Sequence, residues 1–287
     1  MITIPLKKRV SGVTLIELLI STVLGLLIIL GLSTLYLSSQ KSAHTHDAIS
    51  NMEVNARIAL AGLRQTIEHT GFPSIYNVPL DKPFHSAIDG DIDISARCRG
   101  GSEKLVKPTS IKTKVTKDNG TKDWIVVKYM SDNEDDANHE IIRDCLGGKV
   151  DPKCSADPIN GMYNSMNAVV YNAFYISSKK ALLCAGSRSS IPQPIAENIT
   201  NMQFLYGVRS SLGTSYLTAT QVETNKAWEN VISVQVAILA SSDNEVLSQK
   251  EERHFVLLDK KITKDSKYLY RVYSTTINLP NRNRGVL

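Results

Sequence analysis

One acidic side chain lies within the most apolar part of the sequence. Glu17 is the only charged residue between Val13 and Gln40, and the 20 residues of Leu18–Leu37 carry no charge. A carboxylate in an apolar segment is costly unless it finds a partner, so an acid placed there is a functional hypothesis by default. The chemistry that this position predicts is charge pairing with a cationic partner rather than catalysis.

Motifs for catalysis, metals or cofactors are absent from the sequence. It contains no GxSxG, P-loop or GxGxxG pattern, and His139-Glu140 is not followed by a histidine at position 143, so the HExxH zinc motif fails. The loop that begins with Asp89–Asp93 has Ile94 and Gly100 at the positions where a calcium loop requires glycine and glutamate, and Asp132–Asp136 is explained equally well as a solvated hairpin tip. We therefore expect no catalytic residue, metal site or cofactor, and a protein that is not an enzyme.

The segment that carries Glu17 is long enough to cross a membrane. At about 1.5 Å per residue, Leu18–Leu37 spans roughly 30 Å, the thickness of a bilayer core. Residues 1–12 before it hold three basic residues and no acid, and such a flank stays on the cytoplasmic side. The apolar run is too long for a cleaved secretory signal peptide. A plain membrane anchor fits the length but gives no reason for Glu17.

Charge and composition limit the other classes. The chain has 33 basic and 28 acidic residues, a net charge of +5, and removal of the three basic residues in 1–12 would leave 30 against 28, or +2. With 42% hydrophobic and 21% charged residues it is not a disordered chain. Basic residues gather in 249–287, where DNA could bind by counterion release. A solvated strand edge protected by lysines is the favoured interpretation, and DNA is the less favoured partner.

A second apolar pattern follows the membrane segment. A stripe with steps of three or four residues runs along one helix face, and it consists of Ile49, Met52, Ala56, Leu60, Leu63 and Ile67. No proline occurs from Val13 to Gly71, whereas Gly71-Phe72-Pro73 is a helix stop. We predict one helix from Val13 to Thr70, hydrophobic all round in 13–40 and amphipathic in 41–71.

The remaining residues, 72–287, have the pattern of strands. The predicted strands are 124–130, 140–145, 168–176, 181–184, 199–209, 231–240, 253–258 and 268–277, with a hairpin turn at Ser177–Lys180. In Val231–Leu239 one face consists of Ile232, Val234, Val236 and Ile238, is fully apolar, and should face the core. The expected fold class is α+β, with a long N-terminal helix packed on a C-terminal antiparallel β head.

The start of the apolar run resembles a known processing signal. Gly12-Val13-Thr14-Leu15-Ile16-Glu17, placed after a basic leader, resembles the class III signal of type IV prepilins. The resemblance implies that a prepilin peptidase cuts between Gly12 and Val13, removes residues 1–12, and exposes an amine on Val13 that is then methylated. Glu17 becomes the fifth mature residue and pairs with the amine of a neighbouring subunit, which offsets the cost of burying both charges. Val13 departs from the pattern, because Phe or Met is commoner there.

Blocks in the second half of the chain resemble the PilW group of minor pilins. These blocks are Asp144–Gly147, Asn172–Ile176, Leu183-Cys184, Ile199–Val208, Trp228–Val234 and Tyr270–Ile277. The PilW group is itself similar to the J-type minor pseudopilin of type II secretion. The resemblance implies a pilin-like fold and a minor pilin that takes part in type IV pilus assembly, in a priming or tip complex with other minor pilins.

The four cysteines, Cys98, Cys145, Cys154 and Cys184, allow three disulfide connectivities. An even count fits two bridges in an oxidising compartment. Cys145 and Cys184 each end a predicted strand within the blocks that resemble PilW. That favours a Cys145–Cys184 bridge and leaves Cys98–Cys154, with free buried thiols as the alternative.

The resemblance also implies a location and a set of partners. The precursor would cross the bacterial inner membrane once, with its head in the periplasm, and the mature protein would enter the pilus at the cell surface. Its partners would be the prepilin peptidase, other minor pilins, the major pilin and the inner membrane. Two alternatives remain: a J-like minor pseudopilin of a type II secretion system, and a membrane-anchored binding protein or enzyme that never enters a filament.

Overall fold

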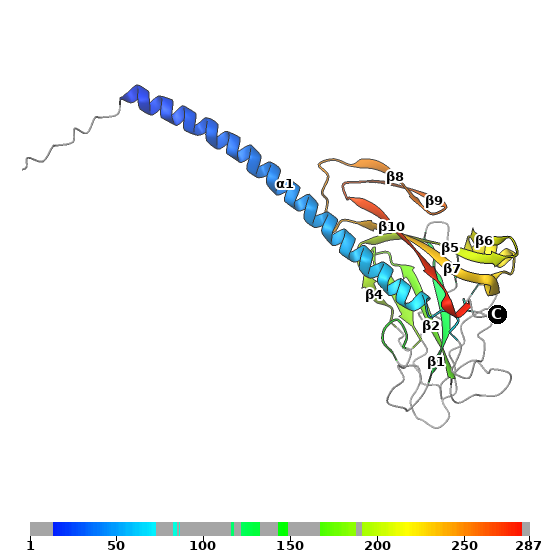
Figure 1. Cartoon of the computed structure of the whole chain (residues 1–287). Helices are drawn as coiled ribbons and strands as arrows, with labels where there is room; N and C mark the ends of the chain where they lie inside the picture. The colour runs from blue at the N-terminus through cyan, green and yellow to red at the C-terminus, as the bar shows by residue number, and fades with distance from the viewer. Residues whose placement is uncertain are drawn as a thin grey trace, which may run out of the picture. The chain divides into compact units, whose positions relative to one another are not determined.

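The computed structural model describes residues 14–72, 83–84, 86, 116–117, 122–132, 143–148, 167–187 and 191–282. The chain divides into two compact units, Met1–Asp47 and Ala48–Leu287, and each is described by itself. The fold class is α+β, as predicted: helix α1 (Leu15–Ile67) comes first, and antiparallel β sheets follow (Figure 1).

In the first unit, α1 presents apolar side chains to the solvent. Its large hydrophobic residues between Leu15 and Leu37 are all exposed, from 54% at Leu19 to 79% at Leu15. The helix begins at Leu15 rather than at the predicted Val13, which lies outside the described residues. A helix that is hydrophobic all round needs an apolar surrounding, such as a membrane or other helices.

In the second unit, α1 buries one face against the β sheets. The buried apolar residues are Met52, Ala56, Ala59, Leu63 and Ile67, which confirms most of the predicted stripe. Ile49 and Leu60 are only partly buried. The approach is close at Gly62, where an added Cβ would lie 3.0 Å from a side-chain carbon of Ile195.

The predicted helix stop is confirmed at Gly71. Helix α1 ends at Ile67, and a turn continues to Gly71, which has a φ of +72° that L side chains rarely adopt. The Gly71 N–H donates to the carbonyl oxygen of Lys128 at 2.9 Å, so the end of the helix is joined to the first strand.

Two four-stranded antiparallel sheets form the body of the second unit. The first has the order β1 (Ile125–Asp132), β2 (Asn167–Ile176), β3 (Leu182–Gly186) and β4 (Gln193–Ala196). The second has the order β10 (Tyr270–Asn278), β7 (Val231–Ser241), β5 (Ile199–Ser210) and β6 (Gly213–Leu217). Strands β8 (Glu251–Leu257) and β9 (Lys260–Ser266) form a separate hairpin. A short helix, α3 (Ala219–Thr224), connects β6 to the 3-10 turn before β7.

The main core joins α1 to both sheets. Its largest fully buried side chains include Phe84, Phe174, Phe204 and Tyr206. In β7 the predicted inward residues Val234, Val236 and Ile238 belong to this core, whereas Ile232 is only half-buried. The opposite face of β7 is buried as well, because Ala237 and Leu239 form a second cluster with Leu257 of the β8–β9 hairpin, drawn in orange beside β7 and β10 (Figure 1).

One predicted strand is wrong. The range 140–145 was expected to be a strand that ends at Cys145, but residues 144–147 form a tight turn, and 140–142 lie outside the described residues. The Asp144 carboxylate accepts hydrogen bonds from the N–H groups of Leu146 (3.0 Å) and Gly148 (2.7 Å), and Gly147 has a φ of +77°. An aspartate that satisfies the backbone two residues later favours a turn over a strand.

Candidate functional site

Glu17 is hydrogen-bonded to Thr14 in the first turn of α1. The N–H of Thr14 donates to Glu17 Oε2 at 3.4 Å, and the N–H of Glu17 donates to Thr14 Oγ1 at 3.3 Å. This is the reciprocal pattern of a capping box, in which Thr is the N-cap and Glu is the third helical residue. A carboxylate at a helix N-terminus is also favoured by the helix dipole. Glu17 therefore has a structural role within one chain, which sequence reasoning missed although Thr-x-x-Glu was readable.

The helix that Glu17 begins has the properties of a membrane segment. By length and composition, α1 is the one helix among the described residues that is long and apolar enough to cross a membrane. Gly12 and Val13, the expected cleavage position, lie outside the described residues, as does the leader 1–12. Of the segment that resembles a prepilin signal, the structure therefore describes Thr14 to Glu17 and the apolar residues that follow.

A disulfide joins Cys145 to Cys184 and ties the turn at 144–148 to strand β3. The two Cα atoms are 6.5 Å apart and the residues are separated by 39 positions in the sequence. This is the bridge that the sequence analysis favours. Cys98 and Cys154 lie outside the described residues. The side-chain oxygen of Asn172, on β2, accepts a hydrogen bond from the Cys145 N–H at 2.7 Å, and this bond connects the same turn to β2.

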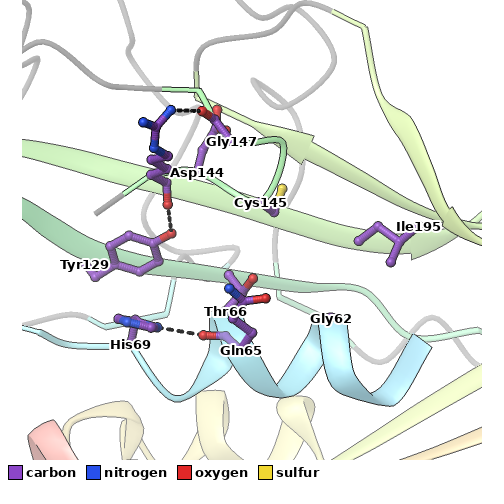
Figure 2. Close-up of a pocket in the computed structure, with 10 residues that line it drawn as sticks. Gly62, Gln65, Thr66, His69, Tyr129, Asp144, Cys145, Gly147 and Ile195 are labelled. Carbon is purple, nitrogen blue, oxygen red and sulfur yellow. Dashed lines mark hydrogen bonds between the residues drawn. The ribbon is translucent and has the colours of Figure 1, made fainter. Parts of the chain in front are cut away.

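Beside the disulfide is a cavity of about 450 Å³ (Figure 2). Its lining comes from α1 and the turn after it, from β1 and β4, and from the segment 143–147. It consists of Gly62, Gln65, Thr66, His69, Tyr129, Arg143, Asp144, Cys145, Gly147 and Ile195. Ligand pockets commonly have volumes of about 300–1,000 Å³, so the size is suitable for a small molecule. No sequence signal linked these residues, because the pocket is formed by segments far apart in the chain.

Tyr129 has the most strongly shifted pKa among the residues that line the cavity. Its hydroxyl donates to the carbonyl oxygen of Arg143 at 2.6 Å (Figure 2). Burial raises the pKa of the Tyr129 phenol well above its usual value of 10.0, the hydrogen bond with Asn172 opposes that shift, and the nearby charge of Asp144 adds to it. A phenol held in its neutral form serves as a hydrogen-bond donor and not as a base at neutral pH.

The second ring in the cavity, that of His69, contacts the ring of Tyr129. His69 is exposed, its Nδ1 lies 2.6 Å from the carbonyl oxygen of Gln65 one helical turn earlier, and its ring centroid is 5.8 Å from that of Tyr129. Within the part of the chain that the structure describes, no three His, Cys, Asp or Glu side chains come together in a group that could hold a metal ion. The cavity offers the Tyr129 phenol as a hydrogen-bond donor and has the polar residues Gln65, Thr66 and Asp144 in its lining.

Comparisons with known proteins give two findings. Residues 169–281 match the family model of PilW, the type IV pilus-assembly protein W. A solved structure, the type IV-like pilin TTHA1219 from Thermus thermophilus, aligns with a TM-score of 0.41 and 10% identity, over 81% of this chain and 98% of that chain. The comparison with curated proteins gives no match. The expected resemblance is thus confirmed over the C-terminal part of the chain, where residues 169–281 are similar to the PilW family of type IV pilus-assembly proteins.

Proposed function

We propose that the protein is a minor pilin that helps to assemble a type IV pilus, within a priming or tip complex of minor pilins. The observation that carries the proposal is the match of residues 169–281 to the pilus-assembly family. The apolar helix α1, exposed along its first half, supports it, because such a surface must be covered by lipid or by other helices. The role is structural rather than enzymatic.

The proposed life of the chain has two stages. The precursor is anchored in the bacterial inner membrane by residues 13–40, with the amphipathic half 41–71 and the head 72–287 in the periplasm. The prepilin peptidase then cuts after Gly12, and the amine of Val13 is methylated. The same helix then moves from lipid into the filament, where the head meets other minor pilins and the major pilin.

Glu17 is the residue that connects these stages. In one chain it caps the helix through Thr14. After cleavage, the amine of Val13 on a neighbouring subunit provides a positive charge, and pairing with Glu17 offsets the cost of burying both groups in an apolar environment. A plain membrane anchor requires only the cap. A filament subunit also requires the negative charge of Glu17, which pairs with the amine of the neighbouring subunit.

Mass spectrometry of the protein purified from its native membrane tests the processing step. We expect a mature N-terminus at Val13 that carries one added methyl group. An intact Met1 on the mature protein would exclude the proposal. A peptidase-deficient strain, in which the same protein should retain residues 1–12, is the matched control.

The two alternatives need a different readout. A J-like minor pseudopilin would undergo the same cleavage, but deletion of its gene would abolish secretion of exoproteins and leave surface pili intact. A membrane-anchored binding protein would keep residues 1–12. Counting surface pili and assaying secretion in the deletion strain separates these from a minor pilin, whose loss should reduce piliation.

A further inference from the structure

The cavity beside Cys145 contains a buried hydroxyl group with an open hydrogen-bonding capacity. Thr66 lines this cavity, is only 7% exposed, and lies above α1 on the side of the helix that faces Cys145 (Figure 2). Thr45, on the same helix, donates its hydroxyl to the carbonyl oxygen of Lys41 at 2.9 Å, whereas the Thr66 hydroxyl has no such partner among the described residues. An unpaired buried hydroxyl is costly, so a folded protein satisfies such a group with water or a ligand.

Two neighbours of Thr66 add further hydrogen-bonding groups to the cavity. Gln65 is in the lining, and its side-chain amide, which has two donors and an acceptor, forms no hydrogen bond within the described part of the chain. Nδ1 of His69 lies 2.6 Å from the carbonyl oxygen of Gln65, so in the neutral ring Nε2 is left as an acceptor. A hydroxyl, an amide and an imidazole therefore border one space from positions 65 to 69.

The charged groups of the lining are engaged with the backbone. The Arg143 guanidinium donates to the carbonyl oxygen of Gly147 at 3.0 Å. The Asp144 carboxylate accepts hydrogen bonds from the N–H groups of Leu146 and Gly148. These two charges are opposite in sign and adjacent in the sequence. The lining therefore offers an ion little net charge, and its open hydrogen-bonding groups are the uncharged ones of Thr66 and Gln65.

Apolar and aromatic surface completes the lining. Gly62 lies against Ile195, since a Cβ added at Gly62 would be 3.0 Å from a side-chain carbon of Ile195. The rings of His69 and Tyr129 have centroids 5.8 Å apart and are tilted by 49°. Figure 2 shows Ile195 and the two rings at opposite ends of the cavity. A ligand here meets ring surface and aliphatic surface as well as the polar groups between them.

We propose that this cavity binds an uncharged sugar ring, whose hydroxyl groups bond to Thr66, Gln65 and His69. An apolar ligand is less suitable, because it would leave the Thr66 hydroxyl unpaired. A pyranose combines hydroxyl groups with an apolar C–H face, which suits a lining of aromatic rings and uncharged polar groups. The volume of about 450 Å³ lies in the range of small-molecule sites. The sugar can be free or the terminal unit of a glycan, and the site is independent of a role in pilus assembly.

Ligand-observed NMR titration of the full-length chain, in micelles of a polyoxyethylene detergent that has no sugar headgroup, tests this proposal. The probes are glucose, galactose and N-acetylglucosamine, each as the free sugar and as its methyl glycoside. We expect at least one probe to bind, and Thr66→Val, which replaces the hydroxyl by a methyl group, to weaken its binding by about fivefold. The matched control is Thr70→Val, which should change affinity by less than about twofold, because the Thr70 hydroxyl is also buried and unpaired but is not in the lining.

The paired probes also identify the source of the sugar. Binding of a methyl glycoside supports a site for the end of a glycan, and binding of the free sugar alone supports a site for a monosaccharide. The proposal is overturned if none of these sugars binds, if Thr66→Val and Thr70→Val weaken binding equally, or if the ions benzoate or benzylamine bind more tightly than every sugar. Equal melting temperatures of the variants exclude loss of the fold. Gln65→Ala, at an exposed position, should also weaken binding and provides the test if Thr66→Val is unstable.

Discussion

Thr14 and Glu17 satisfy each other at the start of α1, where each backbone N–H donates to the other's side-chain oxygen, at 3.3 and 3.4 Å. The apolar run alone gave no reason for an acid at position 17, and the cap supplies one. Two explanations for Glu17 therefore compete: a local cap in one chain, and a charge that pairs with another subunit. Glutamine separates them, because it retains the capping box but loses the charge.

The first prediction uses this difference. Glu17→Gln should keep the helix and its membrane insertion but prevent incorporation into the pilus. Removing one partner of a buried ion pair costs about 3–5 kcal/mol, which is more than a hundredfold in the assembly equilibrium. Quantifying the protein in sheared pili and in membranes measures the ratio between the two pools.

Thr14→Ala is the matched control for the cap. It removes the N-cap at a cost of about 1 kcal/mol but keeps the negative charge of Glu17, so incorporation should stay near the wild-type level. If Glu17→Gln is incorporated normally while Thr14→Ala is not, Glu17 acts only as a cap and the charge-pair mechanism fails.

The second prediction concerns the bridge between Cys145 and Cys184. It closes a loop with a sequence separation of 39, for which the chain-entropy model gives roughly 3–4 kcal/mol. Cys145→Ser and Cys184→Ser should each lower the free energy of unfolding of the head by about that amount in urea titrations. The double variant should be no less stable than either single variant, because both remove the same bond. Additive losses would show that the two sulfurs contribute separately.

Local patterns predicted the parts of the fold that depend on neighbours in the chain. The helix stop at Gly71 and the inward face of β7 were readable because glycine tolerates positive φ and because side chains alternate along a strand. Strand β9 was missed, since its sequence, KKITKDS, has little apolar content. It is a strand because its partner β8 and the cluster around Leu257 provide the hydrogen bonds and the apolar surface.

The parts of the candidate site that could not be predicted depend on contacts between residues far apart in the chain. The turn at Asp144 replaced a predicted strand because its carboxylate satisfies local N–H groups, whereas the β-branched residues just before it favour a strand. The cavity beside Cys145 brings together Gln65 and Tyr129, which lie on α1 and β1. Their proximity depends on packing of the whole second unit, and no spacing in the sequence records it.

The third prediction follows from the contact between Asp144 and Gly186. A Cβ added at Gly186 would lie 2.6 Å from the Asp144 carboxyl carbon, nearer than real Cβ contacts allow. Gly186→Ala should therefore destabilise the head by about 1–3 kcal/mol, as overpacking does. In an Asp144→Ala background the same change should cost at least about 1 kcal/mol less, because the carboxyl group is absent and only the Cβ of residue 144, at 3.0 Å, remains. Equal costs in both backgrounds would mean that the methyl group is accommodated by backbone movement.

The last prediction concerns Tyr129 at alkaline pH. Burial raises its pKa in the folded head above the unfolded value of 10.0, so the fold prefers the neutral phenol. The stability from this preference is fully present below pH 10 and is lost as pH rises above it. The free energy of unfolding should therefore fall more steeply above pH 10 in the wild type than in Tyr129→Phe.

At pH 7 the wild type should be the more stable of the two proteins. Tyr129→Phe loses the hydrogen bond to the Arg143 carbonyl oxygen and should be less stable by about 1 kcal/mol. The difference between the two proteins should then shrink above pH 10, as measured by urea unfolding at several pH values. Tyr175→Phe is the matched control: burial also raises the pKa of Tyr175, but its side chain is only half-buried, so its effect on the slope should be smaller. Parallel pH profiles for the wild type and Tyr129→Phe would mean that the phenol ionises in the folded head as readily as in the unfolded chain.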